Sequence, residues 1–262
     1  MGAPAEVFVA PSAEELAQDV VARLVSTLSA AQNARGRAAL ALTAGSIMQQ
    51  VWEALAASTD AASGIDWSRV DVSWADERFV PADSPERNDL PAQRAIWDHP
   101  PFSRATVYRA PAAGGEFGED LDAAVAAYAR ELRAARRPDD AGDIPSFDVV
   151  LLGVGPDGHC CSIFPDHPSA TDDSGPVIGV RNSPKPPPLR FSLSFAGLDL
   201  AQEIWAIASG TGKAHAVARA LGGANRVEVP SAGAQGRQRT LWLLDQEAAA
   251  ELPPQGYRPP TI

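Results

Sequence analysis

The sequence predicts an α/β fold in which an open, mainly parallel sheet is flanked by helices, as in Rossmann-like proteins. Strand-like and helix-like patterns alternate along most of the 262 residues, which is typical of parallel α/β folds. One strand, FDVVLLG (147–153), is apolar at nearly every position, as expected for a strand covered on both faces. No repeat or convincing linker divides the chain, so we expect a single domain spanning residues 1–262.

The first helix has the clearest signals. Ser12 and Glu15 have the spacing of a capping box, apolar residues follow at i+4 steps from Leu16 to Leu28, and Gly36 ends the helix. The remaining elements follow from apolar alternation for strands, helical spacing for helices, and glycine or proline at their ends. In order they are a strand at 38–42, a helix to about 57, a strand at 70–74, a helix at 90–97, a short strand at 106–108, a helix at 118–137 closed by Pro138, the strand at 147–153, strands at 190–195 and 203–209, a helix at 213–221, a strand at 240–245 and a short Ala-rich helix.

Composition excludes several classes of partner. The formal net charge of −11 does not suit general binding of nucleic acid or of an anionic membrane surface. No stretch is long and apolar enough to span a bilayer, and the N-terminus does not resemble a signal peptide. The two cysteines, Cys160 and Cys161, are adjacent, which predicts neither a disulfide framework nor a zinc site. We therefore expect a cytoplasmic protein with no nucleic-acid partner, no membrane partner and no metal.

The segment GVGPDGH (153–159) matches the G-x-G-x-x-G pattern of dinucleotide sites. Such a site requires a full helix directly afterwards, whereas Pro165 follows His159 by only six residues. The better interpretation is a glycine-rich loop at the carboxyl end of a buried strand, which presents Asp157 and His159. An Asp-x-His pair can orient an imidazole for work as a general base, although a lone histidine is more often structural.

Two further segments carry candidate cations. SGTGKA (209–214) lacks the first glycine and the Ser or Thr of a P-loop, which leaves Lys213 at a strand-to-helix turn that suits a phosphate. In SPKPPPLR (183–190), Lys185 and Arg190 flank three prolines that restrict the backbone. The plainer alternatives are a solvated lysine and a polyproline surface loop.

Two more strand ends carry candidate polar residues. DERFVP (76–81) places Asp76, Glu77 and Arg78 at a strand end, where site residues often lie, and TAGS (43–46) offers Gly45 and Ser46 as a cradle for an oxyanion or phosphate. An ordinary strand-end ion pair is the alternative for DERFVP. No GxSxG elbow and no HExxH motif is present, so serine-hydrolase and metalloenzyme chemistry have no support.

The order of these segments is more specific than any one of them. TAGS, DERFVP followed by Asn88, GVGPDGHCCSIFP, SPKPPPLR, GTGKA and WLLD together resemble the 6-phosphogluconolactonase family, which is similar in fold to glucosamine-6-phosphate deaminases. The resemblance covers about residues 5–250. It implies hydrolysis of 6-phospho-D-glucono-1,5-lactone to 6-phosphogluconate, the second step of the oxidative pentose phosphate pathway, on a fold of the sugar-phosphate isomerase type.

The resemblance also implies roles for individual residues. His159 would be the general base that activates water, and Asp157 would orient it. Cations for the phosphate and the developing oxyanion would come from Arg78, Lys185, Arg190 and Lys213, whose separate roles the sequence does not apportion. Gly45 and Ser46 would line the phosphate side and Asn88 the sugar side. No metal or cofactor is implied, and the partner is the sugar-phosphate lactone, bound by a monomer or a weak homodimer.

The first loop departs from the family pattern, because Thr43, Ala44, Ile47 and Met48 replace the residues of a sequence closer to SGGSTP. The change at Ile47 removes one hydroxyl donor to phosphate and leaves the backbone N–H groups. Cys160 and Cys161 replace Thr-Ala, and an exposed thiol there would be open to oxidation. Two other functions stay open: an isomerase or deaminase of an amino-sugar phosphate, against which SPKPPPLR argues, and a non-catalytic sugar-phosphate sensor, for which no nucleic-acid-binding segment is evident.

Overall fold

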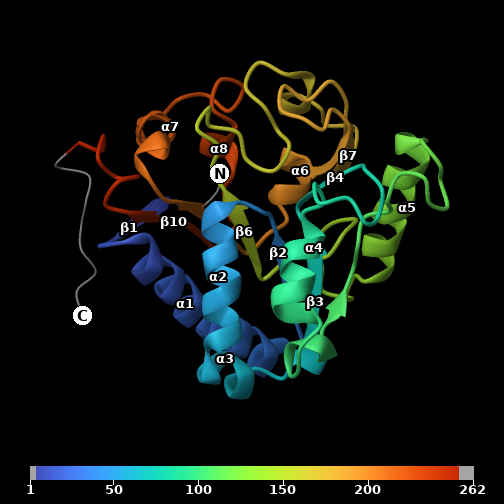
Figure 1. Ribbon diagram of the computed structural model, residues 1–262, viewed down its shortest axis with the longest axis horizontal. Helices are drawn as coiled ribbons and strands as arrows, with labels where there is room; N and C mark the ends of the chain where they lie inside the picture. The colour runs from blue at the N-terminus through green and yellow to red at the C-terminus, as the bar shows by residue number, and fades with distance from the viewer. Residues whose placement is uncertain (1–3, 254–262) are drawn as a thin grey trace.

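The computed structural model describes residues 4–253 and contains two sheets of different kinds (Figure 1). Seven parallel strands form the main sheet in the order β1-β10-β9-β6-β2-β3-β5, and a small antiparallel sheet has the order β4-β8-β7. The strands are β1 (Ala5–Ala10), β2 (Ala38–Leu42), β3 (Val70–Trp74), β4 (Asp76–Arg78), β5 (Thr106–Val107), β6 (Val149–Gly153), β7 (Val177–Val180), β8 (Arg190–Leu193), β9 (Glu203–Ala208) and β10 (Arg239–Asp245). The α-helices are α1 (Ala13–Arg35), α2 (Ser46–Ala57), α3 (Thr59–Gly64), α4 (Asp89–Ala92), α5 (Leu121–Ala134), α6 (Phe195–Leu198), α7 (Ala214–Leu221) and α8 (Pro230–Gly233). The mainly parallel α/β fold expected from the sequence is confirmed.

Both faces of the main sheet are covered. In β2, Leu40 and Leu42 pack with the core residues of α1 and α2, whereas Ala39 and Ala41 belong to a second core that includes residues of α5 and β8. Figure 1 shows α1, α2 and α4 across the front of the sheet, with α5 at the right. Because successive side chains of a strand point to opposite faces, a doubly covered strand must be apolar throughout, and all five residues of β2 are buried.

The predicted ends of α1 are confirmed. The side chain of Ser12 accepts a hydrogen bond from the Glu15 N–H at 3.2 Å, which satisfies one of the free donors of the first turn. Gly36 adopts a φ of 78°, and its N–H donates to the carbonyl oxygen of Gln32. This left-handed conformation is accessible to glycine at little cost, so Gly36 is the residue that ends the helix.

Several predictions of local structure were wrong or incomplete. The strands β1, β4 and β7 were not predicted, and the helix expected at 90–97 is α-helical only in α4 and continues as a π-helix. The helix expected at 118–137 is limited to α5, which begins after Asp120 because this side chain accepts a hydrogen bond from the Ala123 N–H. The expected Ala-rich helix after β10 is a run of turns at 246–251. There Asp245 accepts a hydrogen bond from the Ala248 N–H at 2.8 Å.

The order of the strands makes the connections that leave β2 and β6 run in opposite directions. From β2 the chain continues to β3 and β5 on one side, and β6, β9 and β10 follow on the other side. The segments that leave β2 and β6 therefore diverge at the carboxyl edge, where ligands of open α/β sheets bind. In Figure 1 this edge is the upper one, beneath the yellow and orange loops.

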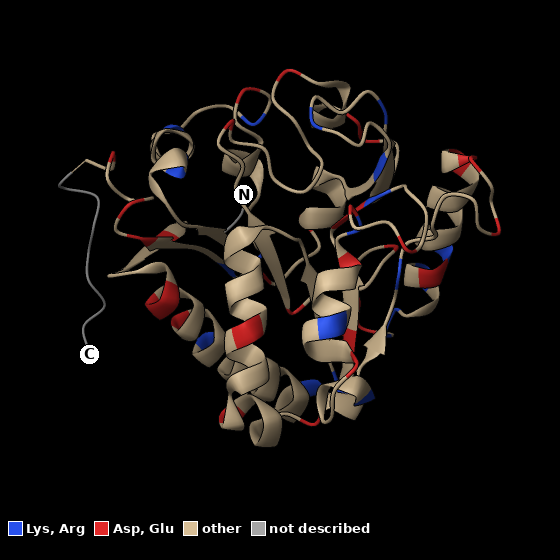
Figure 2. Ribbon diagram, in the orientation of Figure 1, with Lys and Arg blue, Asp and Glu red and all other residues tan. Residues whose placement is uncertain are grey.

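Charged segments are distributed unevenly over the fold. Acidic segments lie on α1, α2 and α5, and the loops above the upper edge of the sheet carry both acidic and basic segments (Figure 2). Among the described residues, no helix has both the length and the apolar character needed to cross a membrane.

Candidate active site

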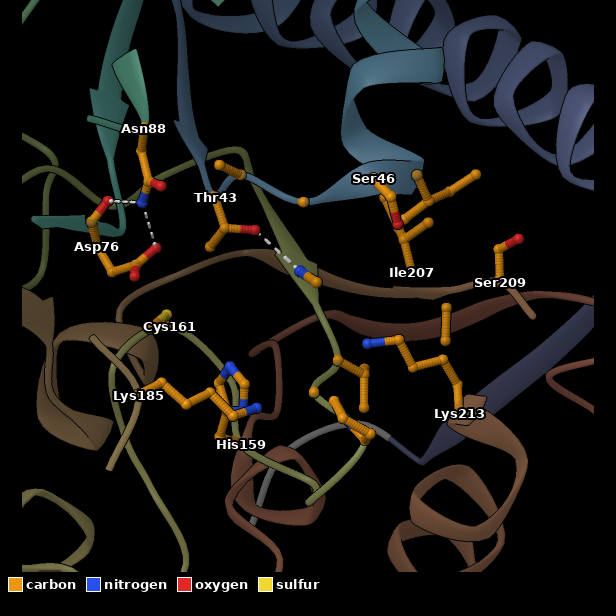
Figure 3. Close-up of a pocket in the computed structure, with 18 of the residues that line it drawn as sticks. Thr43, Ser46, Asp76, Asn88, His159, Cys161, Lys185, Ile207, Ser209 and Lys213 are labelled. Atoms are coloured by element: carbon orange, nitrogen blue, oxygen red, sulfur yellow. Dashed lines mark hydrogen bonds between the residues drawn. The ribbon is translucent and has the colours of Figure 1, made fainter. Parts of the chain in front are cut away.

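A cavity of about 310 Å³ lies at the carboxyl edge of the main sheet (Figure 3). It is lined by the segments that follow β2, β4, β6 and β9, together with the loop that precedes β8. The predicted site residues that line it are Gly45, Ser46, Arg78, Asn88, His159, Lys185, Arg190 and Lys213. The remaining one, Asp157, contacts His159 through Nδ1 and lines a neighbouring hollow. The fold thus brings together residues from six separate sequence segments.

The centre of the site is a contact between an imidazole and a carboxylate. Nδ1 of His159 lies 2.5 Å from Oδ1 of Asp157. The Lys185 ammonium donates to the same Oδ1 at 3.1 Å and also lies 3.1 Å from Nδ1. A carboxylate at Nδ1 favours the tautomer whose proton is on Nδ1, so the Nε2 lone pair is left available on the other side of the ring.

The glycines of GVGPDGH make this contact possible. A Cβ on Gly155 would lie 1.9 Å from Nδ1 of His159, and one on Gly158 would lie 2.7 Å from the side chain of Val229. Gly158 also has a φ of 87°, a conformation that favours glycine. Gly155 therefore allows the loop backbone to approach the imidazole closely, and Gly158 allows the turn to pack against Val229.

Two neighbours keep Asp157 ionised. Burial by itself would raise the pKa of Asp157, but its interactions with His159 and Lys185 outweigh burial and hold that pKa well below its usual range. The carboxylate therefore stays charged at neutral pH, where it can stabilise an imidazolium.

Donors for an anion gather opposite His159. Gly45, with a φ of 149°, precedes α2, and the first turn of this helix has no side-chain cap. The first N–H groups of a helix lack partners within it and attract negative charge. Ser46 lies at this helix start, and Lys213 extends into the cavity from the turn after β9 (Figure 3).

Lys213 is mostly enclosed, and its ammonium group has no hydrogen-bond or ion-pair partner among residues 4–253. Burial lowers the pKa of Lys213, and the positive charge of Lys185 lowers it further. The turn that carries Lys213 is held by Asp245, whose carboxylate accepts hydrogen bonds from the Ser209 hydroxyl at 2.5 Å and the Gly210 N–H at 3.1 Å. An unpaired, partly desolvated cation is well suited to bind an anionic group.

Arg78 and Asn88 line the side of the cavity formed by β4. Nη1 of Arg78 donates to the Glu86 carbonyl oxygen at 2.7 Å. The amide nitrogen of Asn88 donates to the backbone carbonyl and to Oδ1 of Asp76, at 3.0 and 3.2 Å. This orientation leaves Oδ1 of Asn88 buried with no partner among the described residues.

Arg190 has partners that the sequence did not predict. Its guanidinium donates to the backbone carbonyl oxygens of Lys185, Pro186 and Pro187 at 2.8, 2.9 and 3.1 Å. Burial lowers the pKa of Arg190. Because most of its donors are engaged by the chain itself, Arg190 fixes the proline-rich loop and thereby the position of Lys185. A direct contact between Arg190 and a substrate stays a prediction.

The departures in the first loop have separate structural consequences. The Thr43 hydroxyl joins β2 to β6, because it donates to the Leu151 carbonyl oxygen at 3.2 Å and accepts from the Gly153 N–H at 2.9 Å. Met48 is fully buried, while Ile47 lines the cavity with an apolar side chain. The backbone donors at the start of α2 are still present.

The cysteine pair after His159 is enclosed. Cys160 and Cys161 are both free and buried, although Cys161 lines part of the cavity. A hydrogen bond with Cys160, together with burial, raises the pKa of the Cys161 thiol well above its ordinary value. A protonated, enclosed thiol reacts slowly, so this geometry does not favour oxidation at these positions.

Two cavity residues were missed as site residues from the sequence. Thr43 and Ser209 line the cavity, and each lies within a motif that was singled out for a neighbouring residue. Asp76, which the sequence placed at a strand end beside Arg78, lines the cavity too. Within residues 4–253, no group of three or more His, Cys, Asp and Glu side chains is arranged to hold a metal ion.

Comparisons with known proteins agree with this arrangement. Residues 11–242 match the family model described as glucosamine-6-phosphate isomerases/6-phosphogluconolactonase. The chain is 48% identical to 6-phosphogluconolactonase of Streptomyces coelicolor over 94% of each chain, and 45% identical to that of Mycobacterium tuberculosis over 97% of this chain and 100% of the relative. It also resembles the solved structure of 6-phosphogluconolactonase from Trypanosoma brucei, with a TM-score of 0.78 and 26% identity, covering 97% of this chain and 100% of that one.

The depressed pKa of Asp157 predicts a pH-dependent effect of Asp157→Asn on stability. A carboxyl group whose pKa falls on folding contributes stability above its ordinary value, here 3.8, and this contribution is lost as the pH falls towards the folded value. We expect Asp157→Asn to lower the unfolding midpoint in urea at pH 7 and pH 5, with the difference shrinking below pH 3.8. The exposed Asp83→Asn variant serves as the control, and a difference that persists unchanged at pH 3 would contradict the expectation.

Proposed function

The chain belongs to the glucosamine-6-phosphate isomerase/6-phosphogluconolactonase family, and from this premise we propose that it hydrolyses 6-phospho-D-glucono-1,5-lactone to 6-phospho-D-gluconate. The family expected from the order of the motifs is confirmed, and the relatives that match over nearly the whole chain are named 6-phosphogluconolactonases. One observation carries the proposal: His159, which is held by Asp157, lines the same cavity as the start of α2 and Lys213.

His159 is the general base of the proposed reaction. Its Nε2 has no hydrogen-bond partner among the described residues, while Nδ1 is held by Asp157. Nε2 removes a proton from a water molecule as the water oxygen forms a bond to the lactone carbonyl carbon, whose π electrons move to the carbonyl oxygen. The negative charge of Asp157 stabilises the imidazolium that results.

The second half of the reaction returns the proton. When the tetrahedral intermediate collapses, the carbonyl re-forms and the bond between the carbonyl carbon and the ring oxygen breaks. The imidazolium of His159 donates its proton to the departing ring oxygen, which becomes a hydroxyl group, and the free base is restored. Lys185 contacts the His159 ring, with its ammonium 3.1 Å from Nδ1, and lines the cavity, which makes it the candidate for stabilising the oxyanion.

The substrate phosphate binds at the opposite end of the cavity. The unpaired N–H groups at the start of α2, the Ser46 hydroxyl and the Lys213 ammonium converge there. Helix starts of this kind are suited to phosphate, and Lys213 adds a full charge. Binding the phosphate at the end of the cavity away from His159 places the lactone within reach of the base, with Asn88 on the sugar side.

The compartment, partners and oligomeric state are part of the proposal. We propose a cytoplasmic enzyme, since both cysteines are free and buried and a reducing compartment keeps thiols in this state. We further propose that it acts without metal, nucleic-acid or membrane partners, as one domain and as a monomer or a weak homodimer.

Lactone hydrolysis is the first expected activity. The lactone is generated in situ from glucose 6-phosphate by its dehydrogenase, and 6-phosphogluconate is followed by coupled oxidation after spontaneous hydrolysis has been subtracted. We expect acceleration proportional to the amount of protein. Turnover of glucosamine 6-phosphate in place of the lactone would instead indicate a deaminase, and sugar-phosphate binding without turnover of either compound would indicate a sensor.

The role of His159 predicts a loss of rate without a loss of binding. His159→Ala should lower kcat by about 10²–10⁴-fold, the usual contribution of a positioned general base, while the affinity for 6-phosphogluconate in calorimetry changes little. His167→Ala is the matched control, because that histidine hydrogen-bonds to Ser169 and to the Arg181 carbonyl oxygen. Full activity in His159→Ala would refute the mechanism.

The unpaired ammonium of Lys213 predicts an effect on affinity. Lys213→Met should raise KM about tenfold or more with a smaller change in kcat, because a hydrogen bond to a charged group contributes roughly 1.5–3 kcal/mol. Arg219→Met on α7 removes an exposed cation that pairs with Glu228 and should leave KM unchanged. The phosphate assignment fails if the two variants behave alike.

A further inference from the structure

Glu77, in the middle of β4, is a fully buried carboxylate beneath the cavity. Its Oε1 accepts hydrogen bonds from the N–H groups of Arg78 at 2.6 Å and Asn88 at 2.7 Å. Its Oε2 accepts from the Asp89 N–H at 3.0 Å and lies 3.4 Å from the Arg87 guanidinium. Glu77 does not line the cavity, so all these contacts are made to the chain itself.

The backbone groups held by Glu77 belong to residues that face the cavity. Arg78 and Asn88 both line it, and they stand at the two ends of the loop formed by residues 79–87. A single oxygen of Glu77 binds the N–H of each, which joins the start of the loop to its return. Asn88 is held a second time through its side chain, by Asp76. One carboxylate therefore fixes the backbone of Arg78 relative to that of Asn88 on this side of the cavity.

Burying the Glu77 carboxylate costs free energy of folding. Burial raises the pKa of Glu77 to about 7, even though Arg87 and the backbone donors of Asn88 and Arg78 favour the charged form. Buried ion pairs are often no better for stability than apolar residues of similar size. Since a core position would be served as well by an apolar side chain, the contacts of Glu77 are better explained by the placement of the residues it binds.

We propose that Glu77 is a positioning residue of this site: its carboxylate joins both ends of the 79–87 loop and thereby places Arg78 and Asn88 for contact with the substrate. The inference rests on the proposed lactonase function and adds to it a residue that acts only through others. In this proposal the 79–87 loop and its two ends, Arg78 and Asn88, are positioned together by Glu77. The loop of Lys185 is held separately by Arg190, and the turn of Lys213 by Asp245.

The test is Glu77→Gln, measured by the KM for the lactone and the Kd for 6-phosphogluconate. The glutamine oxygen can still accept from Arg78 and Asn88, but its amide nitrogen would face the Asp89 N–H and the Arg87 guanidinium, so donors would oppose donors. We expect both KM and Kd to rise about tenfold, with kcat within threefold of the wild-type value. A variant that is folded and binds as the wild-type protein does would overturn the inference.

Asp148→Asn is the matched control for loss of a buried carboxylate. Asp148 is buried, pairs with Arg35 and Arg137, and accepts a hydrogen bond from the Ala39 N–H at 2.7 Å. It precedes β6 and so lies at the amino edge of the sheet, opposite the cavity. We expect its replacement to change neither KM nor Kd, and an equal rise in both variants would mean that Glu77 acts only on general stability.

A double-mutant cycle tests whether Glu77 acts through the residues it binds. In an Arg78→Ala, Asn88→Ala background, the effect of Glu77→Gln on Kd should fall to less than threefold, because the groups it positions are gone. A tenfold effect that persists in that background would overturn the inference. Because Kd is measured for a product, the cycle remains decisive even if the wild-type protein proves not to hydrolyse the lactone.

Arg87→Lys provides a second route if Glu77→Gln does not fold. Lysine keeps a cation beside Glu77 but cannot reproduce the hydrogen bonds of Arg87 to both Asp89 oxygens and to the Ala110 carbonyl oxygen. A smaller rise in Kd in the same direction supports the positioning role of this cluster. An unchanged Kd in a folded Arg87→Lys protein overturns it.

Discussion

The parallel pairing of β2 with β6 is the constraint on which the rest of the site depends. Leu40 pairs with Val149 and Ala41 with Val150, and the Thr43 hydroxyl joins the two strands again where they end. From this edge the first loop turns towards α2, while the GVGPDGH loop turns towards the opposite side. The phosphate end and the general base can therefore face one cavity only because these two strands are neighbours.

The loops that form that cavity are held by buried charged groups. Asp245 fixes the turn that carries Lys213, Arg190 fixes the loop that carries Lys185, and Glu77 binds both ends of the loop between Arg78 and Asn88. Desolvating these groups costs free energy, whereas the strands below them are apolar and stabilise the fold. The apolar core thus supplies the stability of the fold, while the buried charged groups place the residues of the site.

How much of the site was predictable depended on how local each contact is. Asp157 and His159 are two residues apart in a glycine-rich loop, and their pairing was predicted and is present at 2.5 Å. The four cations were also predicted, but their separate surroundings were not. Arg190 donates to three carbonyl oxygens of the preceding loop, while Lys213 has no partner in the described part of the chain. The sequence shows where the cationic residues are, but it does not show which hydrogen-bond acceptors the folded chain brings near each of them.

The sequence by itself determined the α/β class, the ends of α1, the buried character of β6, the order of the site motifs and hence the family. Each of these depends on residue type and short-range period, which a chain carries before it folds. Only the tertiary structure decided that β1 forms at all, since its partner is β10 at the other end of the described chain. It also decided that Glu77 reaches the N–H groups of Asn88 and Asp89, and that Thr43 joins β2 to β6. These contacts link residues far apart in sequence, and packing against the shared core is what brings them within hydrogen-bond distance.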